Sequence, residues 1–242
     1  MKKKKLSASI ALLRGSRVRK QAVPLRYSSF QLTGRRKSFQ MDSKTKQLTV
    51  GVLAFQGDVR EHIEATEKAG KKLNIRLSVI PVRTKEVLRT LDGLIIPGGE
   101  STTIQKLCER EGMWDAMKKV KGIFGTCAGA ILLADEVDNK ASGQKTLGRI
   151  DMKIDRNAYG RQTESFEQNI ETTLGSVNAV FIRAPKIKTV GKRVSVLAEQ
   201  RGDVLACEQL SPRHYSLATC FHPEYSSTVF HERFLKNIQV YC

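Results

Sequence analysis

The residues best suited to chemistry lie between positions 121 and 134, where an apolar run meets a turn of small residues around Cys127. Residues 121–125 are typical of a strand, Gly125-Thr126-Cys127-Ala128-Gly129 of a sharp turn, and residues 130–134 of a helix. A strand, a strained turn and a helix make a nucleophile elbow, which exposes one reactive side chain at the end of a strand. The flanking glycines leave room for such a turn. The pattern predicts Cys127 as a nucleophile, with a buried structural cysteine as the alternative.

A cysteine nucleophile needs a general base, and the base needs a group that orients it. Of the four histidines, His222 is distinctive because it ends an apolar stretch and is followed two positions later by Glu224. In an extended chain these two side chains project to the same side, so the carboxylate can bond one imidazole nitrogen. His62 and His231 fall on predicted helices, and His214 in a polar turn. The alternative is a solvent-exposed His-Pro-Glu sequence at the end of a strand.

Gly98-Gly99-Glu100-Ser101 follows another predicted strand and opens a helix. Such a turn presents free backbone N–H groups, which suit a developing oxyanion, although a plain strand-to-helix connection is the alternative. Gln56 follows the first predicted strand. Because the carboxyl ends of parallel strands share one edge of a sheet, we expect Gln56, this turn and Cys127 to lie together.

Strands alternate with helices from residue 47 to about residue 148, and shorter strand-like segments follow. The early strands are predicted at 47–55, 76–80, 92–97 and 121–125, with helices after Gln56, at 101–110 and at 113–119. Later strands are predicted at 149–155, 163–173, 178–182, 193–198, 203–208 and 215–221, before a closing helix at 227–240. This order predicts an α/β fold in which helices flank a mostly parallel sheet, with an added antiparallel portion.

Basic residues concentrate in the first 46 positions, which hold 14 of the 42 Lys and Arg side chains and one of the 24 acidic ones. They account for 13 of the net charge of +18, so the excess belongs to an extension and not to a folded face. We predict a disordered extension over residues 1–46 and one folded domain over residues 47–242. The extension resembles an organellar transit segment, and Met41 is an alternative start.

Five cysteines without regular spacing, at positions 108, 127, 207, 220 and 242, argue against a disulfide framework and favour a reducing compartment such as the cytoplasm. No apolar run approaches the roughly 20 residues that a membrane span needs. We therefore expect no membrane partner. Basic residues interleaved with aromatic ones are missing outside the extension, so we expect no nucleic-acid partner either.

Together, three motifs resemble those of class I (triad) glutamine amidotransferases: Pro97-Gly98-Gly99-Glu100-Ser101-Thr102-Thr103, Gly125-Thr126-Cys127-Ala128-Gly129 and Phe221-His222-Pro223-Glu224. More narrowly, the chain resembles the glutaminase subunits of pyridoxal 5′-phosphate synthases. This closer resemblance is carried by the stretches 51–57, 156–162 with Ser165-Phe166, and 180–185. It covers residues 48 to about 240 and implies a flavodoxin-like fold.

The resemblance implies a role for each matching position. It makes Cys127 the nucleophile, His222 the general base and acid, and Glu224 the residue that orients His222. Backbone N–H groups of Gly99 and Ala128 would form the oxyanion hole. L-glutamine would lie against a set of six residues: Gly99, Glu100, Ser101, Arg156, Ile182 and Arg183. Arg161 is a nearby rival to Arg156.

The implied reaction releases glutamate and ammonia, with no metal and no organic cofactor. Ammonia would pass to a separate (β/α)₈ synthase subunit that makes pyridoxal 5′-phosphate. The alternatives are a glutaminase for another synthase, a cysteine peptidase or related hydrolase on the same elbow, and a nucleic-acid-binding protein. One departure follows the triad: Tyr225-Ser226-Ser227 stands where the family more often has Leu-Thr. We expect it not to disturb the triad.

Overall fold

The structure, a computed structural model, describes residues 46–156 and 165–241. Residues 1–45, 157–164 and 242 lie outside this description. The predicted extension over residues 1–46 therefore falls almost wholly outside the described residues. The same holds for most of the 156–162 stretch, including Arg161.

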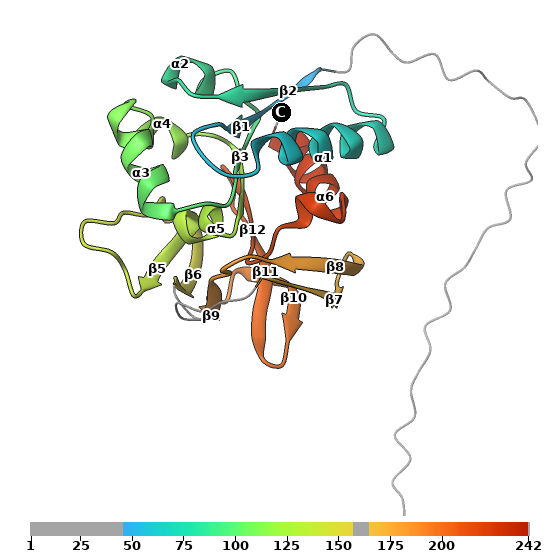
Figure 1. The fold of residues 1–242 in the computed structure, drawn as a ribbon. Coiled ribbons are helices and arrows are strands. Elements are labelled where there is room, and N and C mark those ends of the chain that lie inside the picture. Colours follow the sequence, from blue (N-terminus) through green and yellow to red (C-terminus); the bar gives the residue numbers. More distant parts are fainter. Residues whose placement is uncertain (1–45, 157–164, 242) are drawn as a thin grey trace, which may run out of the picture. The chain divides into compact units, whose positions relative to one another are not determined.

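A row of parallel strands forms the centre of the fold (Figure 1). Its order is β2-β1-β3-β4-β12, and each neighbouring pair is parallel. The bounds are β1 (Leu48–Leu53), β2 (Leu77–Val82), β3 (Gly93–Ile96), β4 (Gly122–Thr126) and β12 (Tyr215–Thr219). Strands β3 and β4 are buried along their whole length. Continuous apolar runs such as Leu94-Ile95-Ile96 arise because helices cover both faces of a parallel sheet.

Helices pack on both faces of these strands (Figure 1). One face carries α1 (Val59–Lys72) and α6 (Val229–Ile238), and the other α3 (Ser101–Arg110), α4 (Trp114–Met117) and α5 (Ala128–Leu133). Alternation along β3 sends Leu94 and Ile96 to the second face and Ile95 to the first. Each such buried side chain contributes roughly 1.5–3 kcal/mol to folding. None of the helices in the described ranges is both long and apolar enough to cross a membrane.

An antiparallel portion extends the sheet beyond β12. The path continues β12-β11-β10-β7-β8, while β5, β6 and β9 branch from β11. The bounds are β5 (Ala134–Asp138), β6 (Ile150–Asp155), β7 (Phe166–Thr172), β8 (Gly175–Phe181), β9 (Lys186–Val190), β10 (Val194–Gln200) and β11 (Asp203–Leu210). All of these pairs are antiparallel except β5 with β6. The predicted α/β class with an added antiparallel portion is confirmed.

Three short elements were not predicted from the sequence: α2 (Lys85–Leu88), β5 and β9. Helix α2 has four residues, too few to show helical periodicity. Strand β5 follows α5 without a linking residue, and we expected its first residue to belong to the helix. Helix α4 is also shorter than the predicted 113–119. The predicted closing helix is split into α6 and a 3₁₀ turn, η2 (Gln239–Tyr241).

The contact between α6 and the sheet depends on a glycine, which gives a testable prediction. A Cβ atom on Gly122 would lie 2.2 Å from Cγ2 of Ile238. We expect Gly122→Ala to lower the free energy of unfolding by about 1–3 kcal/mol, because overpacking forces the neighbours to shift. Chemical denaturation measures this loss. In the double variant Gly122→Ala/Ile238→Ala the clash is gone. Its loss of unfolding free energy should therefore be smaller than the sum of the losses in the two single variants. A loss equal to that sum would contradict the packing argument.

Candidate active site

Cys127 occupies the sharp turn between β4 and α5. Its backbone angles are φ 49° and ψ −105°, a conformation that residues other than glycine seldom adopt. Its N–H donates to the carbonyl of Thr219 at 2.9 Å, which ties the turn to β12. A Cβ atom on Gly129 would lie 2.0 Å from the carbonyl oxygen of Ile96, so the turn also packs directly on the end of β3. The structure therefore contains the strained turn that the sequence predicted.

His222 and Glu224 are hydrogen-bonded just beyond β12. Nδ1 of His222 lies 2.8 Å from Oε1 of Glu224, and the two side chains are 4% and 0% exposed. Our expectation of an extended chain here is wrong, because Pro223 begins a 3₁₀ helix, η1 (Pro223–Tyr225). This turn of the backbone brings the carboxylate back against the imidazole. The pairing that the sequence predicted is present, but it is made by a turn and not by a strand.

The second ring nitrogen of His222, Nε2, is left for the nucleophile. It is buried and makes no hydrogen bond of ordinary geometry within the described residues. The Cys127 thiol still acts on the ring, since it raises the pKa of His222. The ring packs against Gly98, where a Cβ atom would lie 2.4 Å from Cε1 of the imidazole. A side chain at position 98 would therefore displace the histidine.

Hydrogen bonds favour an imidazolium–carboxylate pair in this site. Burial lowers the pKa of His222, but the neighbouring Asp58, Cys127 thiol and Glu224 outweigh it, so the pKa lies well above its ordinary value. Burial raises the pKa of Glu224, but His62 and His222 outweigh it and hold that pKa below its ordinary value. His222 can therefore carry the proton that a leaving group needs, while Glu224 stays ionised.

A buried network on the inner side of α1 holds Glu224 in place. Nε2 of His62 lies 3.3 Å from Oε1 of Glu224 and 3.1 Å from Oγ1 of Thr126. Nδ1 of His62 lies 3.1 Å from Nε2 of His231 on α6. Burial lowers the pKa of His231 to about 3, so this ring is neutral. With its proton on Nε2, His231 donates to Nδ1 of His62, whose Nε2 faces both Oγ1 of Thr126 and Oε1 of Glu224.

The glycine turn after β3 is closed by a side chain from the end of β1. Gly99 has φ +125°, in the region that favours glycine. The N–H of Glu100 donates to Oε1 of Gln56 at 2.8 Å. A Cβ atom on Gly99 would lie 2.8 Å from the same oxygen. Gln56 and this turn therefore meet at the carboxyl edge of the sheet, as expected.

Glu100, Ser101 and Arg156 are linked to one another through Gln144. Glu100 caps α3 by accepting from the N–H groups of Thr102 and Thr103, and it pairs with Arg156. These threonine bonds outweigh the effect of burial and lower the pKa of Glu100 to about 2.

Gln144 accepts a bond from Arg156 at 3.3 Å and donates one to Oγ of Ser101 at 2.9 Å. This glutamine was not predicted from the sequence. Three of the predicted substrate-binding residues are thus gathered into one polar group.

The remaining predicted residues lie at the ends of their elements. The carbonyl of Ile182, just after β8, accepts from Sγ of Cys127 at 3.6 Å. Arg183 is exposed and has φ 46°, so the chain turns sharply beside the thiol. Ala128, buried, is the first residue of α5. The roles of Gly99 and Ala128 as oxyanion donors stay predictions.

Asp58 approaches His222 from the segment before α1. Its Oδ2 atom lies 3.2 Å from Nδ1 of His222, and its Oδ1 accepts from the hydroxyl of Tyr225 at 2.7 Å. Asp58, His222 and Glu224 offer ligand atoms within 4.8 Å of one another, a spacing that a metal ion could also use. Nδ1 of His222 is, however, engaged with the two carboxylates. We therefore interpret Asp58 and Glu224 as partners of the His222 ring and not as metal ligands.

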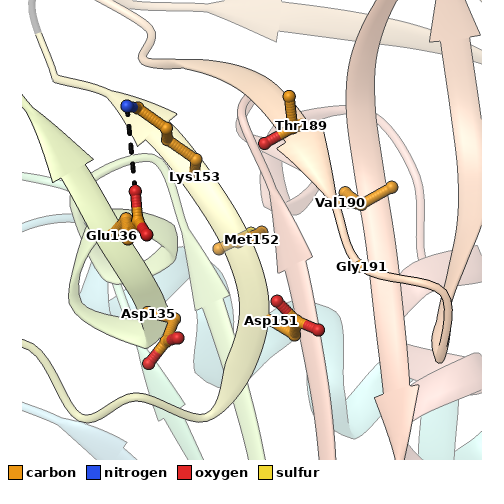
Figure 2. Close-up of a pocket in the computed structure, with 8 residues that line it drawn as sticks. All are labelled: Asp135, Glu136, Asp151, Met152, Lys153, Thr189, Val190 and Gly191. Atoms are coloured by element: carbon orange, nitrogen blue, oxygen red, sulfur yellow. Dashed lines mark ion pairs between the residues drawn. The ribbon is translucent and has the colours of Figure 1, made fainter.

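A separate hollow lies away from this site, between β5, β6 and β9 (Figure 2). Its lining includes Asp135, Asp151 and the ion pair of Lys153 with Glu136. None of the predicted site residues lines it. The predicted chemistry therefore belongs to the carboxyl edge of the parallel strands and not to this hollow.

Besides Gln144, sequence reasoning missed three residues around His222 and Glu224: Asp58, His62 and Tyr225. His62 and His231 do lie on helices, as predicted, but both join the network around the site. Tyr225 was expected to leave the triad undisturbed, yet its hydroxyl bonds a carboxylate that contacts His222. The available signal was position: Asp58 follows Gln56 closely, at the carboxyl end of the first strand.

Comparisons with known proteins agree on one family. The SNO glutamine amidotransferase family matches residues 52–240. Curated relatives named pyridoxal 5′-phosphate synthase subunit PdxT include those of Methanothermobacter thermautotrophicus and Pyrococcus furiosus. The first is 43% identical over 79% of this chain and 97% of its own length, and the second 45% over 78% and 98%.

A solved structure agrees with these relatives. A crystal structure described as a glutamine amidotransferase is 43% identical, with a TM-score of 0.67 over 78% of this chain and 98% of its own. The family match begins at residue 52 and therefore leaves the basic extension outside.

The proximity of the thiol to His222 predicts selective alkylation. Burial raises the pKa of the thiols of Cys108 and Cys207 to about 12, and that of Cys220 further. At pH 7 these three should react slowly with iodoacetamide, while Cys127 reacts fastest among the described cysteines. Peptide mapping by mass spectrometry identifies the modified residue.

His222→Gln is the matching variant, because it removes the imidazole and keeps a polar side chain. It should slow the alkylation of Cys127 at least tenfold at neutral pH. Equal rates in the two proteins would mean that His222 does not act on the sulfur.

Proposed function

Because the chain belongs to the SNO glutamine amidotransferase family, we propose that it hydrolyses the side-chain amide of L-glutamine to glutamate and ammonia. The observation that carries this proposal is the His222–Glu224 bond of 2.8 Å beside Cys127 in a strained elbow. A nucleophile, a base and a carboxylate that orients the base are the parts that acyl transfer from an amide requires.

The first half of the reaction is acylation. The Cys127 thiolate attacks the amide carbon of glutamine, and the developing oxyanion is held by N–H groups of Gly99 and Ala128. His222 then gives a proton to the amide nitrogen, and ammonia leaves as the tetrahedral intermediate collapses to a glutamyl thioester. The raised pKa of His222 supports this step, because the leaving nitrogen needs a proton donor.

The second half is hydrolysis of the thioester. His222, neutral after it has given up its proton, takes one from a water molecule that attacks the carbonyl carbon. Glu224 orients the ring through Nδ1 and stabilises the imidazolium as it forms again. Collapse of the second tetrahedral intermediate releases glutamate and returns the thiolate. All steps use side chains and backbone groups of this chain.

Recognition of free glutamine is assigned to the polar group around Glu100. Glutamine is a zwitterion, so its site needs donors for the α-carboxylate and acceptors for the α-ammonium. Arg156 and Glu100 already pair with each other at this point and supply one of each. Ser101, Ile182 and Arg183 complete the pocket in this proposal. Ile182 is the member whose contact with the sulfur supports its placement most directly.

The ammonia is proposed to serve the synthesis of pyridoxal 5′-phosphate, in a complex with a (β/α)₈ synthase subunit. The support is the name of the relatives, which are subunits of pyridoxal 5′-phosphate synthase and match over most of this chain. A glutaminase that serves another synthase is disfavoured by the same matches. We place the protein in the cytoplasm, since a catalytic thiol and the free buried cysteines suit a reducing compartment.

Replacing the nucleophile tests the reaction. Cys127→Ala should reduce glutamine hydrolysis to below about a thousandth of the wild-type rate, because no other group can form the thioester. Folding and partner binding should survive, since one sulfur is lost from a turn of small residues. A coupled assay for glutamate measures the rate, and thermal unfolding serves as the control. Activity on peptides in place of free glutamine would favour a peptidase instead.

Partner dependence gives a second test. The Gly98-Gly99 turn can change its peptide orientation at little steric cost, and the bond from Glu100 to Gln56 fixes one orientation in the free chain. We expect the isolated chain to be a poor glutaminase. Binding of the synthase partner should raise its rate by about 10²–10³, the usual effect of one oxyanion donor. Steady-state kinetics with and without saturating partner measure the factor. Equal rates would contradict partner gating but not the triad.

A further inference from the structure

Two carboxylates contact Nδ1 of His222, of which only Glu224 belongs to the expected triad. Glu224 approaches Nδ1 from η1 at 2.8 Å, and Asp58 approaches the same atom from the segment before α1 at 3.2 Å. The Glu224 side chain is fully buried, whereas that of Asp58 is 27% exposed. A partly exposed aspartate can turn into water, so its place beside the histidine needs a further contact.

Tyr225 supplies that contact. Its hydroxyl donates to Oδ1 of Asp58 at 2.7 Å, while Oδ2 faces Nδ1 of His222. The two oxygens of Asp58 are thus directed to two partners at once, which fixes the carboxylate plane. The Tyr225 ring lies near the imidazole, with centroids 6.0 Å apart. Leucine, the residue that the resembled family more often has here, offers no donor for this bond.

We propose that Asp58 is a second positioning residue for His222, and that Tyr225 holds it in place. Three residues then surround the base, His222: Glu224, Asp58 and Tyr225. This inference rests on the proposed glutaminase function, because the role of His222 as acid and base comes from there.

Every charged or titratable group near the His222 ring affects the balance between its neutral and protonated forms. Asp58 faces it from the segment before α1, Glu224 and Tyr225 from η1, and Cys127 from the elbow. Two neighbouring groups act indirectly: His62 contacts Glu224, and Glu61 acts on Tyr225. The bonds from His222 and Tyr225 lower the pKa of Asp58 despite its partial burial, so this carboxylate is ionised at neutral pH. His222 therefore lies between two negative charges.

Two negative charges favour the imidazolium over the neutral ring. In the free enzyme this stabilises the pair of thiolate and imidazolium, which makes Cys127 more reactive at neutral pH. In the acyl-enzyme the same charges oppose the neutral imidazole that must activate water. Removing Asp58 should therefore move two pH dependences in opposite directions. A merely structural role for Asp58 would not produce this pair of shifts.

The first measurement is the rate of Cys127 alkylation by iodoacetamide against pH, on the full chain. In Asp58→Asn the midpoint should move to higher pH by about one unit, because an adjacent opposite charge shifts a pKa by one unit or more. Tyr225→Phe and Tyr225→Leu should move it in the same direction by less. Two matched controls, Asp115→Asn and Tyr241→Phe, remove a surface carboxylate and a part-buried hydroxyl bond to the Ser211 carbonyl, and should leave it unchanged.

The second measurement is kcat for glutamine against pH, with the synthase partner present. The acidic limb of the Asp58→Asn profile should move to lower pH, with little change in KM. The double variant Asp58→Asn/Tyr225→Phe should match Asp58→Asn alone, because Tyr225 acts through Asp58. Thermal unfolding of each variant shows that it is folded.

Three results would overturn the proposal. Asp58→Asn could leave the alkylation midpoint where it is. The effect of Tyr225→Phe could persist in the Asp58→Asn background, so that the tyrosine acts by another route. Either variant could change KM alone, which would make these residues substrate contacts. A wild-type protein without glutaminase activity would refute the proposed function instead, and the alkylation profile would still decide the role of Asp58.

Discussion

The parallel pairing of β4 with β12 is the constraint on which the site depends. Its register sets Thr126 beside Thr219, and the next N–H along the chain, that of Cys127, donates to the carbonyl of Thr219. Cys127 and His222 therefore leave the sheet at the same edge, from neighbouring strands. Because both residues closely follow paired strands, the distance between the Cys127 sulfur and the His222 imidazole is set by the sheet and not by a flexible loop.

Strand β3 adds the third component through the same geometry. It pairs with β4 on the side opposite β12, so the glycine turn that follows it lies next to the elbow. Glycine is required on both sides of this contact, since a Cβ atom on Gly129 would strike the Ile96 carbonyl and one on Gly98 would strike His222. The elbow backbone thus packs directly on the end of β3, and the His222 ring on the glycine turn, where the proposed oxyanion would form. The three motifs of the sequence are three loops of one sheet edge.

How much of the fold and the site could be predicted depends on how far apart in the sequence the contacting residues lie. The elbow and the His-Pro-Glu sequence are local patterns, so Cys127, His222 and Glu224 could be predicted from spacing. The backbone conformation of the His-Pro-Glu segment could not be predicted, because Pro223 begins a 3₁₀ turn where an extended chain was expected. Strand alternation predicted the parallel sheet, while the four-residue α2 is too short to leave a periodic signal.

Contacts between distant segments leave little local pattern in the sequence, and for Asp58 the only signal was its position just after the first strand. Asp58 and Tyr225 are 167 residues apart, and His62 and His231 are 169 apart. Each looked like an ordinary helix or turn residue, since only the fold brings it to the histidine. Gln144 was missed for the same reason, because its partners Ser101 and Arg156 lie on other elements.

The buried polar atoms around Glu224 show what this arrangement costs the fold. Oε1 of Glu224 lies within bonding distance of both His222 and His62, while Oε2 has no partner within the described residues. Nε2 of His222 and Nδ1 of His231 are in the same condition. An unpaired buried polar group costs about 1–3 kcal/mol, so folding alone would not favour this cluster.

Two of these three atoms belong to the proposed triad, and the third, on His231, is connected to it through His62. In the proposed reaction His222 needs a free Nε2, because this atom would take and give protons. A carboxylate with one oxygen unbonded keeps more of its charge directed at the imidazole than one whose two oxygens are both neutralised. The polar atoms that weaken the core are therefore the ones that keep His222 ready to transfer protons, and the apolar faces of the sheet supply the stability that this requires.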